Sequence, residues 1–426
     1  MRQPNPATRP TVAVIGSGVS GLTAAYALRH THDVHLYEAD TRVGGHVHTH
    51  SLRAPDGSSR RIDSAFIVHN DRTYPQLTKL LGELGVQVRP TEMSMSISCA
   101  ECGVQFAGGR RGRGVFAQPA NCVRPRFLNL LRQIPRFHRC ATRWLESGND
   151  STLTLGEFVR HWSFGQYFVT HYVVPLVSCV WSTGETQALD YPASYLFRFL
   201  EQHGMLSING SPQWFTIAGG AATYVDKLVE RLPAVSTDRA VTAIVRHEDA
   251  VEVADITGQV RSFDKVVITT HADQALRLLA DPTEAERRVL GVFDYTTNET
   301  VLHTDNALLP QVTAARAAWN YRLNSCAGRQ DRPLVSYWMN KLHGLDPDPG
   351  YLVSLNARDH IAPTLVVEVM QYRHPIYTPR VIDAQKRLPE LNTHRFALAG
   401  AYHGWGFHED GCRSGIAAAA SVGDLT

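Results

Sequence analysis

Three glycines near the N-terminus have the spacing of a turn that binds a diphosphate. Gly16, Gly18 and Gly21 form a G-x-G-x-x-G, with Val19 and Ser20 between the last two. The first glycine permits a tight turn, the second lets the backbone approach a pyrophosphate, and the third allows close packing of a helix on a sheet. The phosphates would lie at the helix N-terminus, where free N–H groups and the helix dipole favour negative charge. The motif therefore predicts a dinucleotide site.

The segments around these glycines are the ones that such a turn requires. Residues 11–15 (TVAVI) form a short β-branched run that is typical of a buried parallel strand. Residues 22–28 (LTAAYAL) favour a helix, and residues 34–37 (VHLY) predict a second strand that ends at Glu38. The Glu38 carboxylate would accept hydrogen bonds from ribose hydroxyls. The complete order of strand, turn, helix, strand and acid distinguishes this motif from an isolated glycine turn.

The residues that follow Glu38 separate FAD from NAD, which share this fold. Residues 39–49 read ADTRVGGHVHT. The segment resembles the R-x-G-G-R/H-x-x-T sequence of the FAD-binding amine oxidase superfamily, which includes phytoene desaturases and protoporphyrinogen oxidases. Nicotinamide dehydrogenases lack it. The resemblance implies that FAD is the cofactor and that the segment contacts it through Ala39, Arg42, Gly44, Gly45 and His46.

A second segment of the same kind lies near the end of the chain. Residues 396–400 (FALAG) predict a strand that ends in a glycine, and residues 416–421 predict a small-residue helix. In the superfamily that it resembles, this segment closes the flavin site, with the strand end facing the ribityl chain and the helix N-terminus pointing at the isoalloxazine. The resemblance implies cofactor contacts from Gly400, Ala401, Phe407 and His408. Ala401 stands where that superfamily usually has an acidic residue.

The resemblance covers the whole chain and implies its organisation. Residues 240–245, 251–255 and 260–270 predict short strands, and in related flavoproteins such a β-meander contacts adenine, here near Val241. We expect an α/β fold with a discontinuous Rossmann-type FAD-binding domain, formed by residues 11–75, 211–290 and 388–426. Residues 76–210 and 291–387 would form an α+β substrate-binding domain of the amine oxidase type.

Composition excludes several classes of protein. The 426 residues include 42 basic and 40 acidic side chains, for a net charge of +2, which gives no support to a nucleic-acid binder. No apolar run of about 18 residues is free of charge, so we expect no transmembrane segment. The first ten residues do not fit a signal peptide, and we expect a cytoplasmic protein. Seven cysteines include one C-x-x-C, at Cys99 and Cys102, without a second pair, so we expect no metal site.

One stretch of the sequence is strongly basic. Between Arg110 and Arg143 there are nine arginines and no acidic residue, so the rest of the chain sums to −7. Part of the stretch has the apolar periodicity of an amphipathic helix. Its arginines would either meet the acidic remainder of the chain or bind an acidic carrier protein, an acyl-CoA or an anionic lipid surface.

Three side chains are candidates for the chemistry. In amine oxidases the position that matches Phe407 is often a tyrosine of an aromatic cage in front of the flavin, and Trp405 belongs to the same motif. Some members hold a water beside the flavin with a lysine, a role that would fall to Lys341. No second nucleotide fingerprint is present, so we expect the electrons to come from the substrate, and oxygen or another acceptor to reoxidise the flavin.

Three functions remain open. The first is hydride removal from a substrate C–H bond to flavin N5, in amine oxidation or in desaturation of a small molecule. The second is a desaturase or isomerase of a fatty-acyl or polyene chain. The third is a non-catalytic binding protein, because the fold resembles that of prenyl-GTPase escort proteins, which have lost the flavin. The intact glycines and Glu38 argue against the third, and we expect an FAD-dependent oxidase or dehydrogenase.

Overall fold

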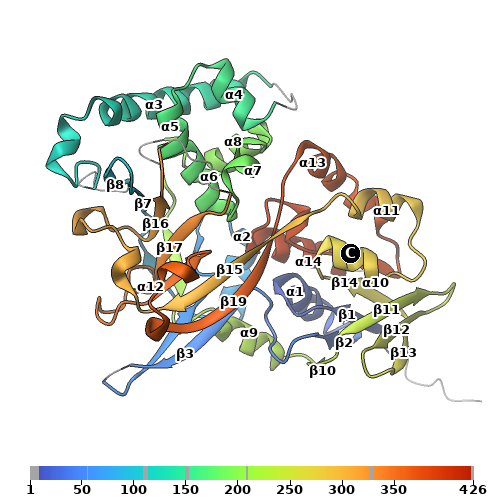
Figure 1. Cartoon of the computed structure of the whole chain (residues 1–426). Helices are drawn as coiled ribbons and strands as arrows, with labels where there is room; N and C mark the ends of the chain where they lie inside the picture. Colours follow the sequence, from blue (N-terminus) through green and yellow to red (C-terminus); the bar gives the residue numbers. More distant parts are fainter. Residues whose placement is uncertain are drawn as a thin grey trace, which may run out of the picture.

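A parallel sheet forms the first part of the molecule. The structure is a computed structural model that describes residues 9–54, 56–108, 114–148, 153–207, 210–326 and 331–423. In sheet order the strands are β10 (Ala234–Ser236), β2 (Asp33–Tyr37), β1 (Thr11–Ile15), β14 (Lys265–Ile268) and β20 (Phe396–Leu398) (Figure 1). All neighbouring pairs are parallel, so the carboxyl ends of the strands share one edge. Ligands bind at this edge in open α/β sheets.

Strand β1 is apolar throughout because both of its faces are covered. Val12 and Val14 are buried in one core, whereas Ala13 and Ile15 are buried in another. Helices α1 (Val19–Leu28) and α14 (His408–Gly423) lie together over the first face. Glycines of α14 permit this close packing, since a Cβ at Gly415 would lie 2.3 Å from the carbonyl oxygen of Ser20.

A mixed sheet of seven strands forms the second part. In sheet order the strands are β19 (Val366–Pro375), β15 (Tyr295–His303), β18 (Leu352–Leu355), β17 (Leu334–Trp338), β16 (Trp319–Leu323), β7 (Met95–Cys99) and β8 (Gln105–Gly108). Strand β16 pairs with β7 in parallel, and the other neighbours are antiparallel. The long strands β15 and β19 lie side by side and run toward the first part (Figure 1).

A helical layer lies at the β7–β8 end of this sheet. It consists of α3 (Pro125–Glu146), α4 (Leu155–His161), α5 (Gln166–Phe168), α6 (Val174–Trp181), α7 (Glu185–Leu189) and α8 (Ala193–Gln202) (Figure 1). A π-helical turn, η2 (Val169–Val173), joins α5 to α6. The helices enclose a core of fully buried rings, which includes Phe127, Phe137, Phe158, Phe168 and Phe197.

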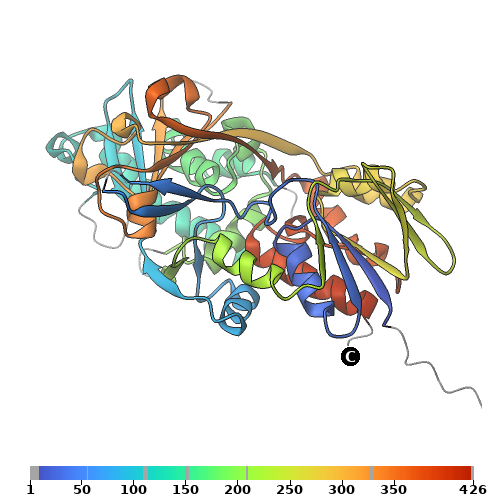
Figure 2. The ribbon, with the colours of Figure 1, turned by 90° about the horizontal axis from the view of Figure 1, so that it is seen from below.

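Smaller elements complete the chain. Strands β11 (Val241–Arg246), β12 (Val251–Asp255) and β13 (Val260–Phe263) form the antiparallel meander at the outer side of the parallel sheet (Figure 2). Strand β3 (Thr49–Arg53) pairs with β4 (Ser59–Asp63), and β9 (Trp214–Ile217) lies between β5 (His69–Asn70) and β6 (Val88–Thr91). The remaining α-helices are α2 (Pro75–Glu83, nine residues), α9 (Ala222–Val229, eight), α10 (Ala272–Leu278, seven), α11 (Glu284–Leu290, seven), α12 (Met339–His343, five) and α13 (Pro379–Gln385, seven).

Three separate segments of the chain supply the parallel sheet. Its strands lie within residues 11–75, 211–290 and 388–426, and the seven strands of the mixed sheet lie within 76–210 and 291–387. Helix α2 begins at the first of these boundaries, and its Leu77 and Leu80 pack in the core of the parallel-sheet part. The exact domain limits stay a prediction.

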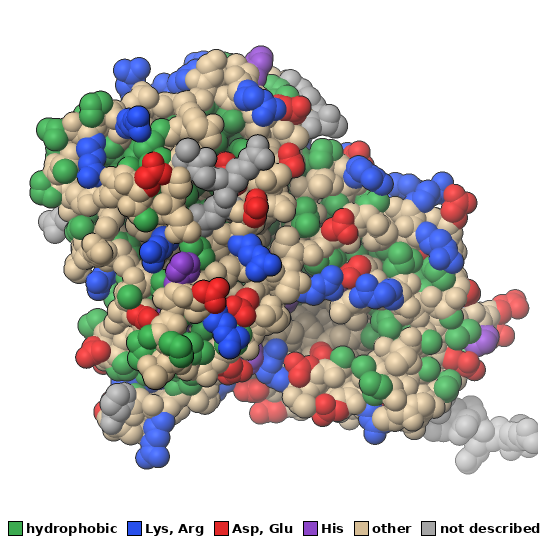
Figure 3. All heavy atoms as spheres, viewed as in Figure 1, with side chains coloured by type: hydrophobic (Ala, Val, Ile, Leu, Met, Phe, Trp, Pro, Cys, Tyr) green, Lys and Arg blue, Asp and Glu red, His purple; other side chains and the backbone are tan. Residues whose placement is uncertain are grey.

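Helix α3 carries much of the basic stretch. Arg126, Arg132, Arg139 and Arg143 are exposed, whereas Arg136 donates to the carbonyl oxygen of Trp162. Figure 3 shows Lys and Arg side chains gathered on the surface over α3 and α4. Arg110, Arg111 and Arg113 lie outside the described residues. Among the described helices, none has the length and apolar character that crossing a bilayer requires.

Candidate active site

A cavity of about 650 Å³ lies between the two parts of the molecule. Its lining includes the carboxyl ends of β1, β2 and β14 from one part and residues of β15–β19 from the other. Most residues expected to contact the cofactor line it: Gly16, Gly18, Val19, Ser20, Glu38, Ala39, Gly45, His46, Val241, Gly400, Ala401, Phe407 and His408. Gly21, Arg42, Gly44 and Lys341 are not in this lining.

The glycine turn after β1 has the geometry that its sequence predicts. Gly16 has a φ of +100°, a conformation that favours glycine. A Cβ at Gly21 would lie 1.9 Å from the carbonyl oxygen of Gly16, so only glycine lets α1 pack against the strand. A Cβ at Gly18 would meet no atom within 4 Å and would point into open space. Gly18 thus leaves room at the helix N-terminus, where a diphosphate would bind.

Ser17 connects the glycine turn to the acidic residue and to the glycine pair. The Glu38 carboxylate accepts hydrogen bonds from the backbone N–H of Ser17, at 2.9 Å, and from its hydroxyl. The backbone N–H of Gly44 donates to Ser17 Oγ at 3.0 Å. The sequence did not single out Ser17, because the motif leaves that position unspecified.

The glycine pair approaches the turn directly. Gly44 and Gly45 have φ values of +113° and +56°, and a Cβ at Gly45 would lie 3.1 Å from Gly18 Cα. The Arg42 guanidinium donates to the carbonyl oxygens of Gly45, at 2.9 Å, and of Val47, at 2.6 Å. Arg42 therefore holds the loop from behind, and its direct contact with the cofactor stays a prediction.

The C-terminal segment forms the opposite side of the cavity. The Asp410 carboxylate accepts from the N–H of Phe407 at 3.1 Å and fixes the start of α14. The Glu409 carboxylate accepts from the N–H groups of Gln76 and Leu77 and so caps α2. The ring of His408 stacks on that of Phe66 with 3.6 Å between centroids. These contacts hold Phe407 and His408 in the cavity wall.

The lining fits a long dinucleotide with a flavin ring. The glycine turn could bind a diphosphate, and Glu38 could bind a ribose. Val241 of the meander also lines the cavity, where it could contact an adenine. Three buried polar atoms of the lining lack a protein partner among the described residues: His271 Nδ1, Trp319 Nε1 and Tyr402 OH. Such atoms need a hydrogen-bond partner, which a bound cofactor or substrate can provide.

The rest of the lining is a wall of apolar and aromatic side chains. Phe407 stacks on Phe199 with 4.9 Å between centroids, and its ring meets the edge of Trp181 at 6.1 Å. Trp181 Nε1 donates to the carbonyl oxygen of Trp405 at 3.0 Å, which ties α6 to the C-terminal segment. Further members of the wall are Met93, Met205, Trp214, Trp319, Tyr337, Leu355 and Tyr372. Sequence reasoning missed most of these residues because nothing in their spacing distinguishes them from the core.

The cavity lining has few acidic side chains. Glu38 is the only carboxylate among the described lining residues, and it lies at the glycine turn. Arg277 and Arg373 both pair with Asp273 at 3.0 Å. Burial lowers the pKa of His271 to about 4 and that of His374 to about 3, so both rings are neutral near pH 7.

Neutral histidines occur both in the cavity and elsewhere in the described part of the molecule, and we expect them to make it sensitive to acid. Burial lowers the pKa of nine of them to about 4 or, for His374, about 3: His48, His69, His138, His203, His271, His303, His343, His374 and His403. Below about pH 6.5 the histidines of the unfolded chain bind protons, whereas the buried histidines of the folded chain stay neutral. Folding stability is therefore lost progressively as the pH falls to about 4. Asp63 and Asp410, with pKa values raised to about 7 and about 6, act in the opposite direction but are fewer.

Urea unfolding of the purified protein at several pH values measures this effect. We expect the free energy of unfolding to fall by several kcal/mol between about pH 7 and pH 4.5. A midpoint that stays constant over this interval would show that the histidines are not held neutral by the fold.

Lys341 is not brought to the cavity, which corrects the expectation that it holds a water beside the flavin. It lies in α12, and its ammonium pairs with the Glu92 carboxylate at 2.9 Å. The two side chains are 27% and 51% exposed. No lysine is present among the described residues of the lining.

We therefore expect Lys341→Met to have almost no effect on folding stability, flavin content or turnover. Breaking a solvent-exposed ion pair changes the free energy of unfolding by less than about 1 kcal/mol. Flavin content and kcat should stay within about twofold of the parent, as determined by absorbance and steady-state assay. A loss of kcat of more than about tenfold would show that Lys341 takes part in the reaction after all.

Comparison with known sequences decides the family. The sequence profile of the flavin containing amine oxidoreductases matches residues 19–423. The chain belongs to this family. Membership of this family indicates a flavin-dependent oxidoreductase, and the sequence motifs predict that the flavin is FAD.

Individual relatives of this flavin amine oxidoreductase are distant. Coproporphyrinogen III oxidase of Mycobacterium leprae is 25% identical over 291 residues, which cover 64% of this chain and 62% of that protein. Tryptophan 2-monooxygenase of Agrobacterium vitis is 46% identical over 56 residues, 13% of this chain and 7% of that protein. The chain thus matches less than two thirds of the length of either relative.

Solved structures share the fold over nearly the whole chain. Cyclohexylamine oxidase from Brevibacterium oxydans has a TM-score of 0.68 at 14% identity and covers 98% of this chain and 99% of its own. A fatty acid isomerase from P. acnes that produces CLA has a TM-score of 0.66 at 14% identity, with coverage of 97% and 98%. At such identities the likeness shows the fold alone.

Proposed function

We propose that this oxidoreductase removes hydride from a C–H bond of an apolar small molecule that binds uncharged against the aromatic wall. The observation that carries the proposal is the composition of that wall, which contains no carboxylate among the residues that the structure describes. A cationic group buried there would lack a counter-ion, which is costly. The substrate classes that fit are apolar amines in their neutral form and hydrocarbon chains.

The protein's own residues would bind and orient this substrate. The glycine turn and Glu38 would hold FAD, which when bound would supply the two-electron oxidation of the substrate carbon. The rings of Phe407, Phe199 and Trp181 form a closely packed surface that excludes water and restricts the substrate's orientation. For an amine, the nitrogen loses one proton to solvent as the carbon loses hydride, which leaves an imine.

A second candidate is desaturation or isomerisation of a fatty-acyl or polyene chain. Phe407 favours it, because phenylalanine provides an aromatic face without a hydroxyl that would need a polar partner. The P. acnes neighbour, a fatty acid isomerase, shows that the fold can serve such chemistry.

Anaerobic reduction of the bound flavin separates these classes. The holoprotein is mixed with an apolar monoamine, a dicationic diamine of similar length, and a fatty acid, and the loss of visible flavin absorbance is followed. We expect bleaching by the monoamine at a rate that rises with pH as the amine becomes neutral. Bleaching by the fatty acid alone would favour the second candidate, and bleaching by the diamine alone would contradict the proposal.

A further inference from the structure

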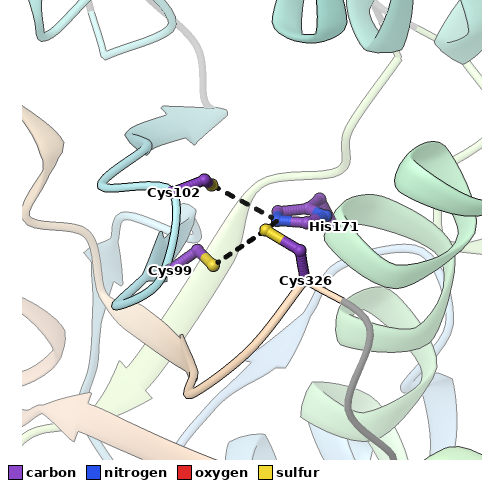
Figure 4. A group of neighbouring side chains, drawn as sticks. All are labelled: Cys99, Cys102, His171 and Cys326. Carbon is purple, nitrogen blue, oxygen red and sulfur yellow. Dashed lines mark hydrogen bonds between the residues drawn. The ribbon is translucent and has the colours of Figure 1, made fainter.

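Four potential metal ligands meet outside the cavity, at the junction of the mixed sheet and the helical layer. Cys99 ends β7, Cys102 lies in the turn that leads to β8, Cys326 follows β16, and His171 lies in the π-helical turn η2. Figure 4 shows the three thiols and the imidazole pointing toward a common centre. Their ligand atoms all lie within 4.8 Å of one another. None of the four residues lines the cavity.

The separations match the edges of a tetrahedral zinc site. Cys99 Sγ lies 3.6 Å from Cys326 Sγ, and His171 Nε2 lies 3.7 Å from the Sγ atoms of both Cys102 and Cys326. Zinc bonds of about 2.3 Å to sulfur and about 2.05 Å to nitrogen give edges of about 3.8 Å between sulfurs and about 3.6 Å between sulfur and nitrogen. A disulfide needs about 2.05 Å between sulfurs, so Cys99 and Cys326 are not bonded to each other.

The histidine is oriented as a metal-binding histidine is. His171 Nδ1 lies 3.0 Å from the carbonyl oxygen of Tyr167, so that Nδ1 carries the proton and Nε2 presents its lone pair to the sulfurs. The Tyr167 ring stacks on the imidazole with 3.8 Å between centroids, and its hydroxyl lies 3.6 Å from Cys102 Sγ.

The backbone around the cysteines is also arranged for ligation. Gly103, directly after the second cysteine, has a φ of +67°, and its N–H donates to the carbonyl oxygen of Cys99 at 3.0 Å, which closes a tight knuckle. The Glu101 carboxylate accepts from the N–H of Cys326 at 2.8 Å and so holds the loop after β16 against this knuckle. Loops that are far apart in sequence are thus fixed around one point.

We propose that Cys99, Cys102, His171 and Cys326 bind one Zn²⁺ in a closed structural site. Three thiols and an imidazole are a complete ligand set for zinc and leave no position for a substrate. On binding, the thiols release their protons to solvent and their thiolates coordinate the ion. The site joins the β7–β8 turn and the end of β16 to the helices that lead, through α6, to Trp181 in the cavity wall.

The sequence alone did not predict this site, and the proposal reverses that expectation. The C-x-x-C at Cys99 and Cys102 lacks a second pair, and its two partners lie far along the chain in different elements. Only the parallel pairing of β7 with β16 brings Cys326 to the knuckle.

Metal analysis of the full-length protein, purified without added metal or chelator, tests the proposal. We expect about one zinc per chain, with a zinc K-edge absorption spectrum that shows three sulfurs at about 2.3 Å and one nitrogen at about 2.05 Å. Removal of zinc by a strong chelator should lower the thermal midpoint, and added Zn²⁺ should restore it.

Two ligand variants and one control extend the test. Cys102→Ser and His171→Ala should each retain less than about one fifth of the zinc. Cys122→Ser changes an exposed cysteine outside the cluster and should retain all of it. Less than about 0.1 zinc per chain in the parent, even after incubation with Zn²⁺, would overturn the proposal, as would iron in place of zinc or a Cys99–Cys326 disulfide. The parent's metal content is decisive if the variants fail to fold, and it does not depend on the substrate.

Discussion

The Gly18→Ala variant is expected to fold normally and to lose most of its affinity for FAD. The φ of Gly18 is −63°, which any residue adopts, and its added Cβ would meet no protein atom within 4 Å. The methyl group would instead occupy the space in which the backbone must approach the diphosphate. We expect the dissociation constant of FAD to rise by at least about tenfold, which corresponds to about 1.4 kcal/mol, while the thermal midpoint of the FAD-free protein changes by only a few degrees.

The same substitution three residues later provides the matched control. A Cβ at Gly21 would lie 1.9 Å from the carbonyl oxygen of Gly16 and 2.6 Å from Thr269 Oγ1. Gly21→Ala should therefore destabilise the turn itself and lower the midpoint of the FAD-free protein. FAD titrations followed by fluorescence, together with thermal unfolding, separate the two effects. Unchanged FAD affinity in Gly18→Ala would place the diphosphate elsewhere.

The second large effect is expected at Phe407, where alanine should impair turnover with an apolar substrate. The phenyl ring contributes to a surface shared with Phe199 and Trp181, and its removal leaves a gap that water can enter. We expect kcat/KM to fall by about 10- to 100-fold, which is about 1.4–2.8 kcal/mol of lost transition-state stabilisation. The flavin content of Phe407→Ala, determined from the visible spectrum, verifies that the cofactor remains bound.

Phe407→Tyr is the control for this variant, because it keeps the aromatic face and adds only a hydroxyl. Its kcat/KM should stay within about threefold of the parent if the face is what matters. Equal activity of the alanine variant and the parent on every apolar substrate would show that Phe407 does not contact the substrate.

The cofactor half of the site could be predicted from the sequence because its determinants are local. Gly16 and Gly21 belong to one turn, in which a Cβ at Gly21 would lie 1.9 Å from the carbonyl oxygen of Gly16, and Gly44 has a φ of +113°, which favours glycine. Glu38 follows the adjacent strand at a spacing set by one βαβ unit. Such short-range constraints leave a pattern that a single sequence displays.

The substrate half could not be predicted, because it is assembled from distant elements. Phe199 comes from α8, Tyr337 from β17 and Tyr372 from β19, and each has neighbours typical of ordinary core positions. The position of Lys341 was wrong for the same reason, since the sequence placed it after an apolar strand without showing which way the following helix turns. The zinc ligands Cys326 and His171 depend equally on long-range packing.

The basic stretch keeps two interpretations. Arg126, Arg132, Arg139 and Arg143 of α3 are exposed, and the only acidic residue of this helix is Glu146, at its last position. Binding to an acidic carrier or a lipid surface stays a prediction, which sedimentation with anionic vesicles at low and high salt would test.

The most direct test of the central claim is the flavin itself. The purified protein is incubated with FAD, passed through a desalting column, and examined by visible absorption before and after an apolar monoamine is added without oxygen. The structure predicts about one FAD retained per chain, with a flavin spectrum that bleaches on addition of the substrate. A protein that retains no FAD, although it is folded and its cavity is intact, would contradict the account.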